Sequence, residues 1–260
     1  MAGKHPSYAN PTIIEALCEI HFAPGNREKF SVNRPLPLFK LLQDDFVQVE
    51  LIPETNLKFE VGETEGVKKI VHRERQRLRF GNEEGNRLLQ VSPGADVFVY
   101  NVLPPYPGWK EVQATILRLW SAVSPILVPT AISRVGLRYI NIIPHTKTHQ
   151  KLADWIRPTK SIPEQLVLSI PTYEFVLKTT VTEEHRFNQT IKWLDPSNEN
   201  PFGATLFDLD HIWEGSSTCD LGELLDSLHE EIWSNFDGAC TPTLREYLHG
   251  TGKDQTSGGF

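Results

Sequence analysis

A run of basic side chains occupies alternate positions of one extended segment, residues 67–80. Its members all carry odd numbers: Lys69, Arg73, Arg75, Arg77 and Arg79. Because successive side chains of a β-strand point to opposite faces, a strand here would place all of them on one face, with Arg87 extending that face across the next hairpin. Neighbouring like charges repel, so some anion must compensate them. An acidic protein partner, a nucleic-acid backbone, or nearby acids such as Glu74, Glu83 and Glu84 could do so.

A second group of arginines lies in the segment SRVGLRYIN, residues 133–141. In a regular strand Arg134, Gly136 and Arg138 share one face, while Tyr139 lies on the other. Glycine between two arginines leaves room for close approach, and two guanidinium groups can clamp a carboxylate or a phosphate. In the alternative interpretation, both arginines pair with acids across the sheet or at the junction of two halves of the chain.

Acidic residues recur at strand spacing in two other places. Asp208 and Asp210 would share a face and could hold a divalent cation, although one strand supplies too few ligands for a complete site. Glu15, Glu19 and His21 would likewise share a face and could form an acid–base group. Surface charges are more often solvated or paired with one another, and this stays the alternative interpretation for both sets.

No recognised catalytic motif accompanies these residues. The chain has no GxSxG, no P-loop, no GxGxxG and no HExxH. Its cysteines, Cys18, Cys219 and Cys240, have no zinc-site spacing, which favours free thiols in a reducing compartment. We therefore expect neither a catalytic residue nor a cofactor.

Hydrophobic periodicity predicts the elements that position these residues. In the first part of the chain we expect strands over residues 13–22, 57–61, 67–80, 87–91 and 96–102, and helices over 37–49 and 109–123. In the second part we expect strands over 131–143, 166–182, 185–194 and 204–213, and helices over 150–156, 220–236 and 242–248. The short hairpins at residues 81–85 and 92–95 favour antiparallel pairing and an α+β fold.

The two parts follow the same order of strand, helix, antiparallel meander and helix, which indicates an internal duplication. The halves would cover residues 13–128 and 129–249, with a break near residues 124–129. Residues 1–12 would form an N-terminal arm, and residues 250–260, rich in glycine and serine, a disordered tail.

Composition narrows the class of protein. The formal net charge of −7 disfavours nucleic acid as the general partner. No segment is apolar enough for a signal peptide or a membrane span, so we expect a cytoplasmic protein without membrane contact.

The string R-x-G-L-R-Y-I-N at residues 134–141 allows a comparison with a known family. Together with PTIIEALCEIHF, PPYPGW and FDLD elsewhere in the chain, it resembles a sporadically distributed prokaryotic family of uncharacterised proteins of this length. The resemblance implies no activity. Such families often lie near mobile or defence genes, which suggests a bacterial defence or regulatory complex.

Three functions therefore follow from the sequence. The first is a non-catalytic interaction or regulatory module that binds an acidic protein partner through its arginine-bearing faces. The second is a small-ligand sensor, with a pocket between the halves lined by aromatic residues such as Tyr139, Trp193 and Trp213. The third is a nuclease or another phosphate-handling enzyme that uses the arginines with Asp208 and Asp210.

Overall fold

The computed structural model describes residues 5–6, 8–24, 36–61, 67–92, 96–157, 164, 172–215 and 220–251. The side chains of residues 53–61, 67–76 and 92 are not among those described. The predictions for residues 62–66, 93–95, 166–171 and 252–260 fall outside this part of the chain, as does Cys219.

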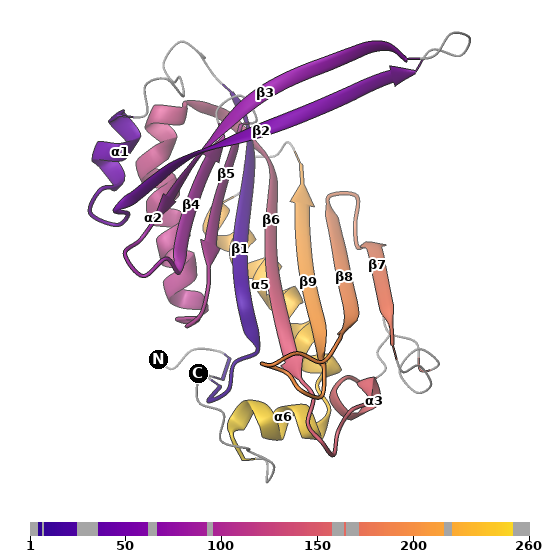
Figure 1. Cartoon of the computed structure of the whole chain (residues 1–260). Helices are drawn as coiled ribbons and strands as arrows, with labels where there is room; N and C mark the ends of the chain where they lie inside the picture. Colours follow the sequence, from indigo (N-terminus) through magenta and orange to yellow (C-terminus); the bar gives the residue numbers. More distant parts are fainter. Residues whose placement is uncertain are drawn as a thin grey trace.

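The chain forms a single antiparallel sheet of nine strands in the order β2-β3-β4-β5-β1-β6-β9-β8-β7 (Figure 1). The strands are β1 Ile13–Pro24, β2 Gln48–Val61, β3 Val67–Gly81, β4 Arg87–Ser92, β5 Val97–Val102, β6 Pro129–Pro144, β7 Glu174–Thr180, β8 His185–Leu194 and β9 Ala204–Glu214. The predicted α+β class and antiparallel pairing are thus confirmed.

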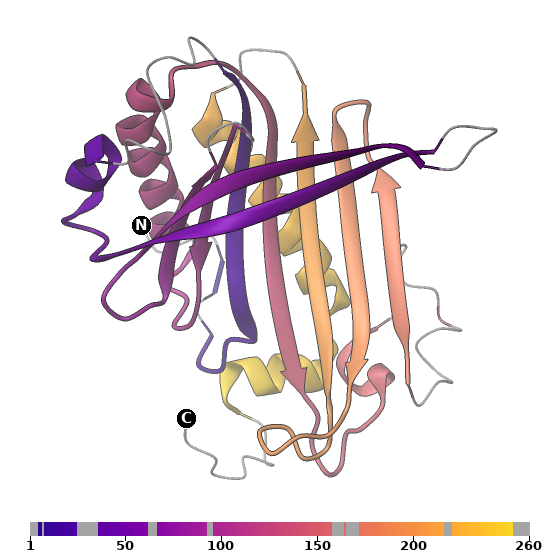
Figure 2. The same cartoon turned by 45° about the horizontal axis from the view of Figure 1, so that its top comes forward.

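Helices cover one face of the sheet. In the described part of the chain they are α1 Leu36–Leu42, α2 Trp109–Leu127, α3 Leu152–Trp155, α5 Leu221–Ala239 and α6 Pro242–His249. The long helices α2 and α5 lie behind the sheet in both views, and no helix of the described residues lies on the opposite face (Figures 1 and 2). We call this uncovered side the open face.

Alternation along β1 decides which of its residues meet the helices. Ala16, Cys18, Ile20 and Phe22 are all buried in the core, as period-two spacing predicts. The same spacing would bury Ile14, but Ile14 is 37% exposed. The register of β1 against β6 shifts between Ile13 and Glu15, and this β-bulge interrupts the alternation.

The helix expected over residues 37–49 is shorter than predicted. Helix α1 ends at Leu42, and β2 already begins at Gln48 instead of residue 57. Asp45 follows the end of α1 and accepts two hydrogen bonds from Arg118 of α2, at 2.7 and 2.9 Å. Carboxylates are unfavourable at a helix C-terminus, and this ion pair holds the chain in a turn instead.

The expected break near residues 124–129 falls at the junction of α2 and β6. Helix α2 continues through Pro125 to Leu127 and ends at Val128, which has a left-handed φ of 51°. Strand β6 starts at the next residue and pairs with β1 in the middle of the sheet. The two parts of the chain therefore meet inside one sheet.

Some of the remaining boundaries also differ from those predicted. Strand β7 begins at Glu174, later than expected, α3 is confined to four residues, and α5 extends three residues beyond its predicted end at 236. The Asp220 carboxylate caps α5 by accepting a hydrogen bond from the Glu223 backbone N–H. Among the described residues, no helix has the length and the apolar composition needed to cross a membrane.

The hairpin formed by β2 and β3 extends beyond the body of the sheet. Its strands pair from Gln48↔Gly81 to Val61↔Val67, whereas β4 pairs only with Leu78–Gly81 of β3. The two views show the hairpin leaving the plane of the sheet and reaching across on the side of the open face (Figures 1 and 2).

Candidate functional site

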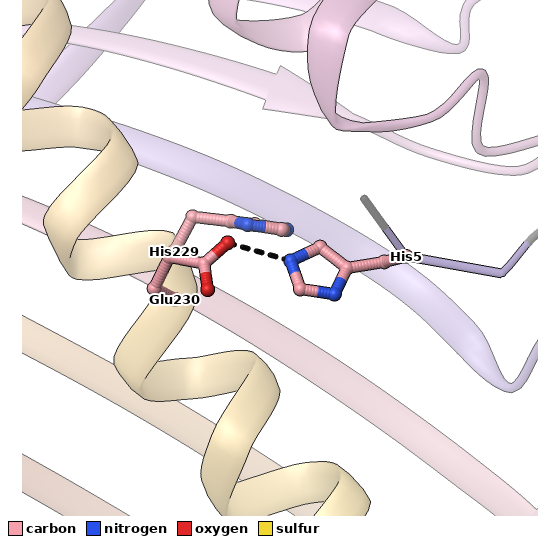
Figure 3. Close-up of side chains that lie close together, drawn as sticks. All are labelled: His5, His229 and Glu230. Atoms are coloured by element: carbon pink, nitrogen blue, oxygen red, sulfur yellow. Dashed lines mark hydrogen bonds and ion pairs between the residues drawn. The ribbon is translucent and has the colours of Figure 1, made fainter. Parts of the chain in front are cut away.

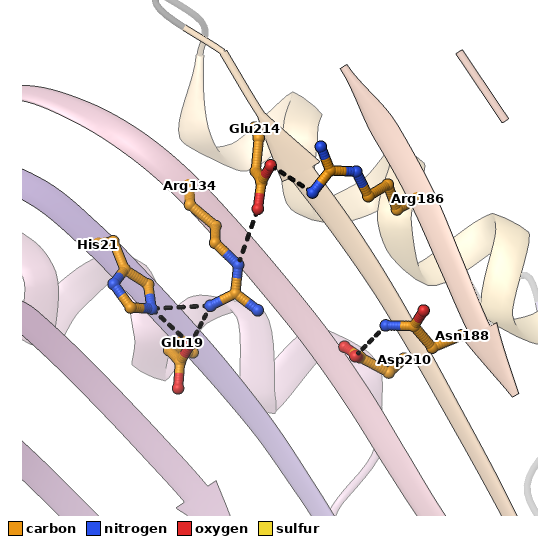
Figure 4. Close-up of polar contacts among 7 residues, drawn as sticks. All are labelled: Glu19, His21, Arg134, Arg186, Asn188, Asp210 and Glu214. Atoms are coloured by element: carbon orange, nitrogen blue, oxygen red, sulfur yellow. Dashed lines mark hydrogen bonds and ion pairs between the residues drawn. The ribbon is translucent and has the colours of Figure 1, made fainter. Parts of the chain in front are cut away.

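Two groups of polar side chains are candidates for function. A group of two histidines and a glutamate lies on the helix side of the sheet (Figure 3). A larger network of charged and amide side chains lies on the open face, over β1, β6, β8 and β9 (Figure 4). The second group contains most of the residues that the sequence singled out.

Arg134 of β6 is at the centre of one part of this network. Its Nη1 atom donates to the Glu19 carboxylate of β1 and lies 2.7 Å from His21 Nε2. Its Nε atom lies 3.6 Å from a Glu214 oxygen of β9, and Arg186 of β8 approaches the other oxygen of Glu214 at 2.7 Å. The predicted pairing of Arg134 with acids across the sheet is therefore observed (Figure 4).

Glu19 and His21 lie on one face, as the spacing predicts. His21 Nε2 lies 2.5 Å from Glu19 Oε1. This hydrogen bond, together with the charge of Arg134, lowers the pKa of Glu19 to about 2, although its partial burial acts in the opposite direction. Glu19 is thus a fixed anion near neutral pH, which makes it unsuited to accept a proton as a general base.

Arg138 makes a two-point ion pair on the open face. Its Nε and Nη2 atoms donate to the two carboxylate oxygens of Asp208, at 2.8 and 2.6 Å. The Asp208 side chain is only 9% exposed, whereas that of Arg138 is 43% exposed. The carboxylate therefore lies beneath the guanidinium group and fixes its orientation.

Asp210 of β9 is close to both Arg134 and Arg138. It accepts a hydrogen bond of 3.0 Å from Asn188 Nδ2. Burial raises its pKa, and the charges of Arg138 and Arg134 only partly oppose this effect. A Cβ atom at Gly136 would lie 3.9 Å from Arg134 Nη2 and 3.9 Å from Asp210 Oδ1, so there is space above this glycine.

Glu15 belongs to a different chain of contacts. Asn101 of β5 donates to Glu15 at 2.5 Å, Gln90 of β4 donates to Asn101 at 3.2 Å, and Arg77 of β3 donates to Gln90 at 3.0 Å. Sequence reasoning overlooked the amide side chains Asn101, Gln90 and Asn188. The available signal was polar residues in strands at positions where alternation points them away from the core.

Some of the basic residues of β3 lie opposite acids of β2, whereas Arg73 and Arg77 lie opposite Asn56 and Ile52. Arg79 donates to Glu50 at 2.6 and 3.2 Å, and the backbone register pairs Arg75 with Glu54 and Lys69 with Glu60. The side chains of Arg73 and Arg75 are outside the described part of the chain, so their binding role stays a prediction. The register supports compensation by the protein's own acids.

Arg87 does not extend this basic face. It shares the core-facing side of β4 with the buried residues Leu89 and Val91. Its guanidinium group donates to the backbone oxygens of Asn86 and Leu103. The expectation failed because the register of β4 against β3 pairs Arg79 with Gln90 and not with Arg87.

The aromatic residues expected around a ligand pocket contact different neighbours. Tyr139 is buried on the helix side, 2.8 Å from the hydroxyl of Tyr106. Trp213 donates to Glu184, and Trp193 donates to Asp195. A cavity of about 180 Å³ instead lies on the helix side beside α1 and α2, lined mainly by polar residues that include Arg118. The sensor hypothesis therefore gains no pocket from these aromatic residues.

The predicted pair Asp208 and Asp210 does lie on one face, but Arg138 occupies both oxygens of Asp208. Within the described part of the chain, no His, Cys or other acid comes close enough to complete a metal site with the two aspartates. The phosphate-handling alternative therefore lacks geometric support here.

No family model matches this chain, and a search of the curated proteins finds no match either.

Proposed function

We propose that the protein is a non-catalytic interaction module that binds an acidic protein partner through the open face of its sheet. The Arg138–Asp208 ion pair carries this proposal. It presents a half-exposed guanidinium group above a buried carboxylate, so the outermost charge at the centre of the face is positive.

In the neighbouring pair both side chains are exposed, the guanidinium group more than the carboxylate. The Arg186 side chain is 53% exposed and its partner Glu214 is 38% exposed. A guanidinium group already held by an acid loses little side-chain freedom when a partner carboxylate arrives, and its remaining N–H groups can donate to that carboxylate. The two arginines thus present preorganised guanidinium groups over β6, β9 and β8, beside the carboxylates of Asp208, Asp210 and Glu214.

The hairpin of β2 and β3 would contribute a second contact region. It reaches across on the same side as the open face (Figure 2), and it carries the alternating arginines of β3. An acidic segment could bind the open face and the hairpin together, which would suit a regulatory complex, including one in bacterial defence.

The test begins with a partner recovered by co-purification from the native host and identified by mass spectrometry. Binding of that purified partner is then measured for wild type, for Arg138→Gln combined with Asp208→Asn, and for Arg186→Glu. Each exposed contact contributes about 0.2–1 kcal/mol, so the neutralised pair should weaken binding a few-fold. Charge reversal at residue 186 should weaken it further, since like charges then meet.

A separate variant tests the hairpin. Arg75→Glu with Arg77→Glu should abolish binding if the hairpin takes part, while circular dichroism and the melting temperature stay those of a folded chain. Lys110→Glu is the matched control, because Lys110 is an exposed cation on α2, behind the sheet. Wild-type affinity in all the open-face variants, or equal loss in the Lys110 control, would contradict the proposal.

We also propose that the two halves of the chain arose by duplication. The order β1-β5-β4-β3 outward from the centre of the sheet corresponds to β6-β9-β8-β7 on the other side. The last strand in each half leads into a 19-residue helix on the same face, α2 or α5. Superposing the two halves in an experimental structure tests this idea, and helices that cross the strands in different directions would count against it.

A further inference from the structure

A second group of side chains lies on the helix side of the sheet and does not depend on the proposed function. His5 of the N-terminal segment and His229 and Glu230 of α5 bring one ligand atom each within 4.8 Å of one another. Figure 3 shows His5 facing the two α5 side chains, with its Nε2 atom 2.7 Å from Glu230 Oε1.

One member of this group is held in place by aromatic rings. The His229 ring is stacked on Trp109 of α2, with ring centroids 4.3 Å apart and planes inclined by 6°. Tyr139 of β6 contacts the same ring edge-on at 5.8 Å. Trp109 is itself oriented by its N–H group, which donates to Asp226 at 2.7 Å. His229, 7% exposed, therefore has a fixed position between the sheet and α2.

The other two members can adjust. The Glu230 side chain is 40% exposed and that of His5 is 18% exposed. Two ligands bound tetrahedrally to one zinc ion, about 2.0–2.1 Å from it, are separated by about 3.3 Å. Small rotations of the His5 and Glu230 side chains towards His229 would reach this spacing, and the metal would replace the hydrogen bond between them.

The geometry points to a binding site for a divalent transition-metal ion, Zn²⁺ in particular, formed by His5, His229 and Glu230. Two imidazole nitrogens and one carboxylate oxygen are a ligand set typical of zinc, with water in the fourth position. Calcium and magnesium prefer sets made of oxygen ligands. The ion would fasten the N-terminal segment to α5, since His5 is the one ligand that comes from outside the helix.

Further aromatic rings lie beside the three proposed ligands. Trp233 lies against His5 with centroids 4.4 Å apart, and Tyr8 is stacked on Trp233 at 6.1 Å. These rings surround the ligands with apolar surface, which reduces the competition of water for the ion. They also give the site its optical readout, because tryptophan fluorescence should respond when His5 and Glu230 move.

The experiment uses the full chain without a polyhistidine tag and titrates it with ZnCl₂ or MgCl₂ by calorimetry. We expect one zinc ion per chain and no response to magnesium. At a free zinc concentration of about 100 Kd, the melting temperature should rise by roughly 5–10 °C. His5→Ala and Glu230→Gln should each weaken zinc binding roughly tenfold or more.

His249→Ala is the matched control. His249 lies next to Tyr8, with ring centroids 5.3 Å apart, but is not part of the group, so its loss should leave the affinity unchanged. Melting temperatures measured with EDTA separate loss of the metal from loss of the hydrogen bond between His5 and Glu230. Absence of zinc binding, or wild-type affinity in both His5→Ala and Glu230→Gln, would overturn the assignment.

Discussion

Replacing Arg138 with glutamine removes the cation above a carboxylate that has little contact with water. Breaking a buried ion pair costs about 3–5 kcal/mol, and breaking an exposed one costs about 0–1 kcal/mol. The Arg138–Asp208 pair is intermediate, because Asp208 is 9% exposed and Arg138 is 43% exposed. We therefore expect Arg138→Gln to lower the free energy of unfolding by about 2 kcal/mol, and the melting temperature by roughly 5 °C.

The double variant gives the sharper test. Arg138→Gln combined with Asp208→Asn leaves no buried charge, so it should cost less than Arg138→Gln alone, about 1 kcal/mol. Urea unfolding of wild type, both single variants and the double variant yields the coupling free energy of the pair.

Arg79→Gln is the control for this measurement. Arg79 pairs with Glu50 on the same face, but their side chains are 39% and 56% exposed, so its loss should cost less than about 0.5 kcal/mol. The argument from burial is refuted if Arg138→Gln and Arg79→Gln destabilise equally. It is also refuted if the cost of the double variant equals the sum of the two single costs.

Two further predictions concern pH and glycine. Burial lowers the pKa of His145 from 6.5 to about 4, so as the pH drops the unfolded chain binds a proton at His145 before the folded chain does. The free energy of unfolding should therefore fall between these two pKa values, by up to about 3 kcal/mol. Unfolding measured at pH 7 and pH 4.5 checks this, and a decrease of the same size in His145→Gln would disprove it. Gly136→Ala should raise the free energy of unfolding by roughly 0.5–1 kcal/mol, because the added Cβ has no atom nearer than 3.9 Å. Gly203→Ala should be destabilising instead, because Gly203 has a φ of 82° and an added Cβ would lie 2.5 Å from the Trp193 ring. Equal stability of the two alanine variants would contradict both expectations.

Local patterns were enough to locate most strands and the two long helices. Strand β8 has the predicted bounds, His185–Leu194, because its apolar residues alternate with polar ones and a turn precedes it. The apolar residues of α2 recur at helical spacing, which locates the helix; of these, Val112, Ile116, Leu119 and Val123 are buried and Trp120 is partly buried. Local periodicity failed for residues 43–49, where the ion pair of Asp45 with Arg118 decides the turn.

The sequence by itself determined the class of the fold, the alternation that places Arg134, Gly136 and Arg138 together, and the shared face of Glu19 and His21. These features depend on the period of a strand, which neighbouring residues fix. Only the tertiary structure decided what each of them contacts. Arg134 meets Glu19 across 115 positions, and Arg138 meets Asp208 across 70. Such pairings follow from the strand order and the register, because the hydrogen bonds between strands bring distant segments side by side and nothing in the local sequence specifies the partner.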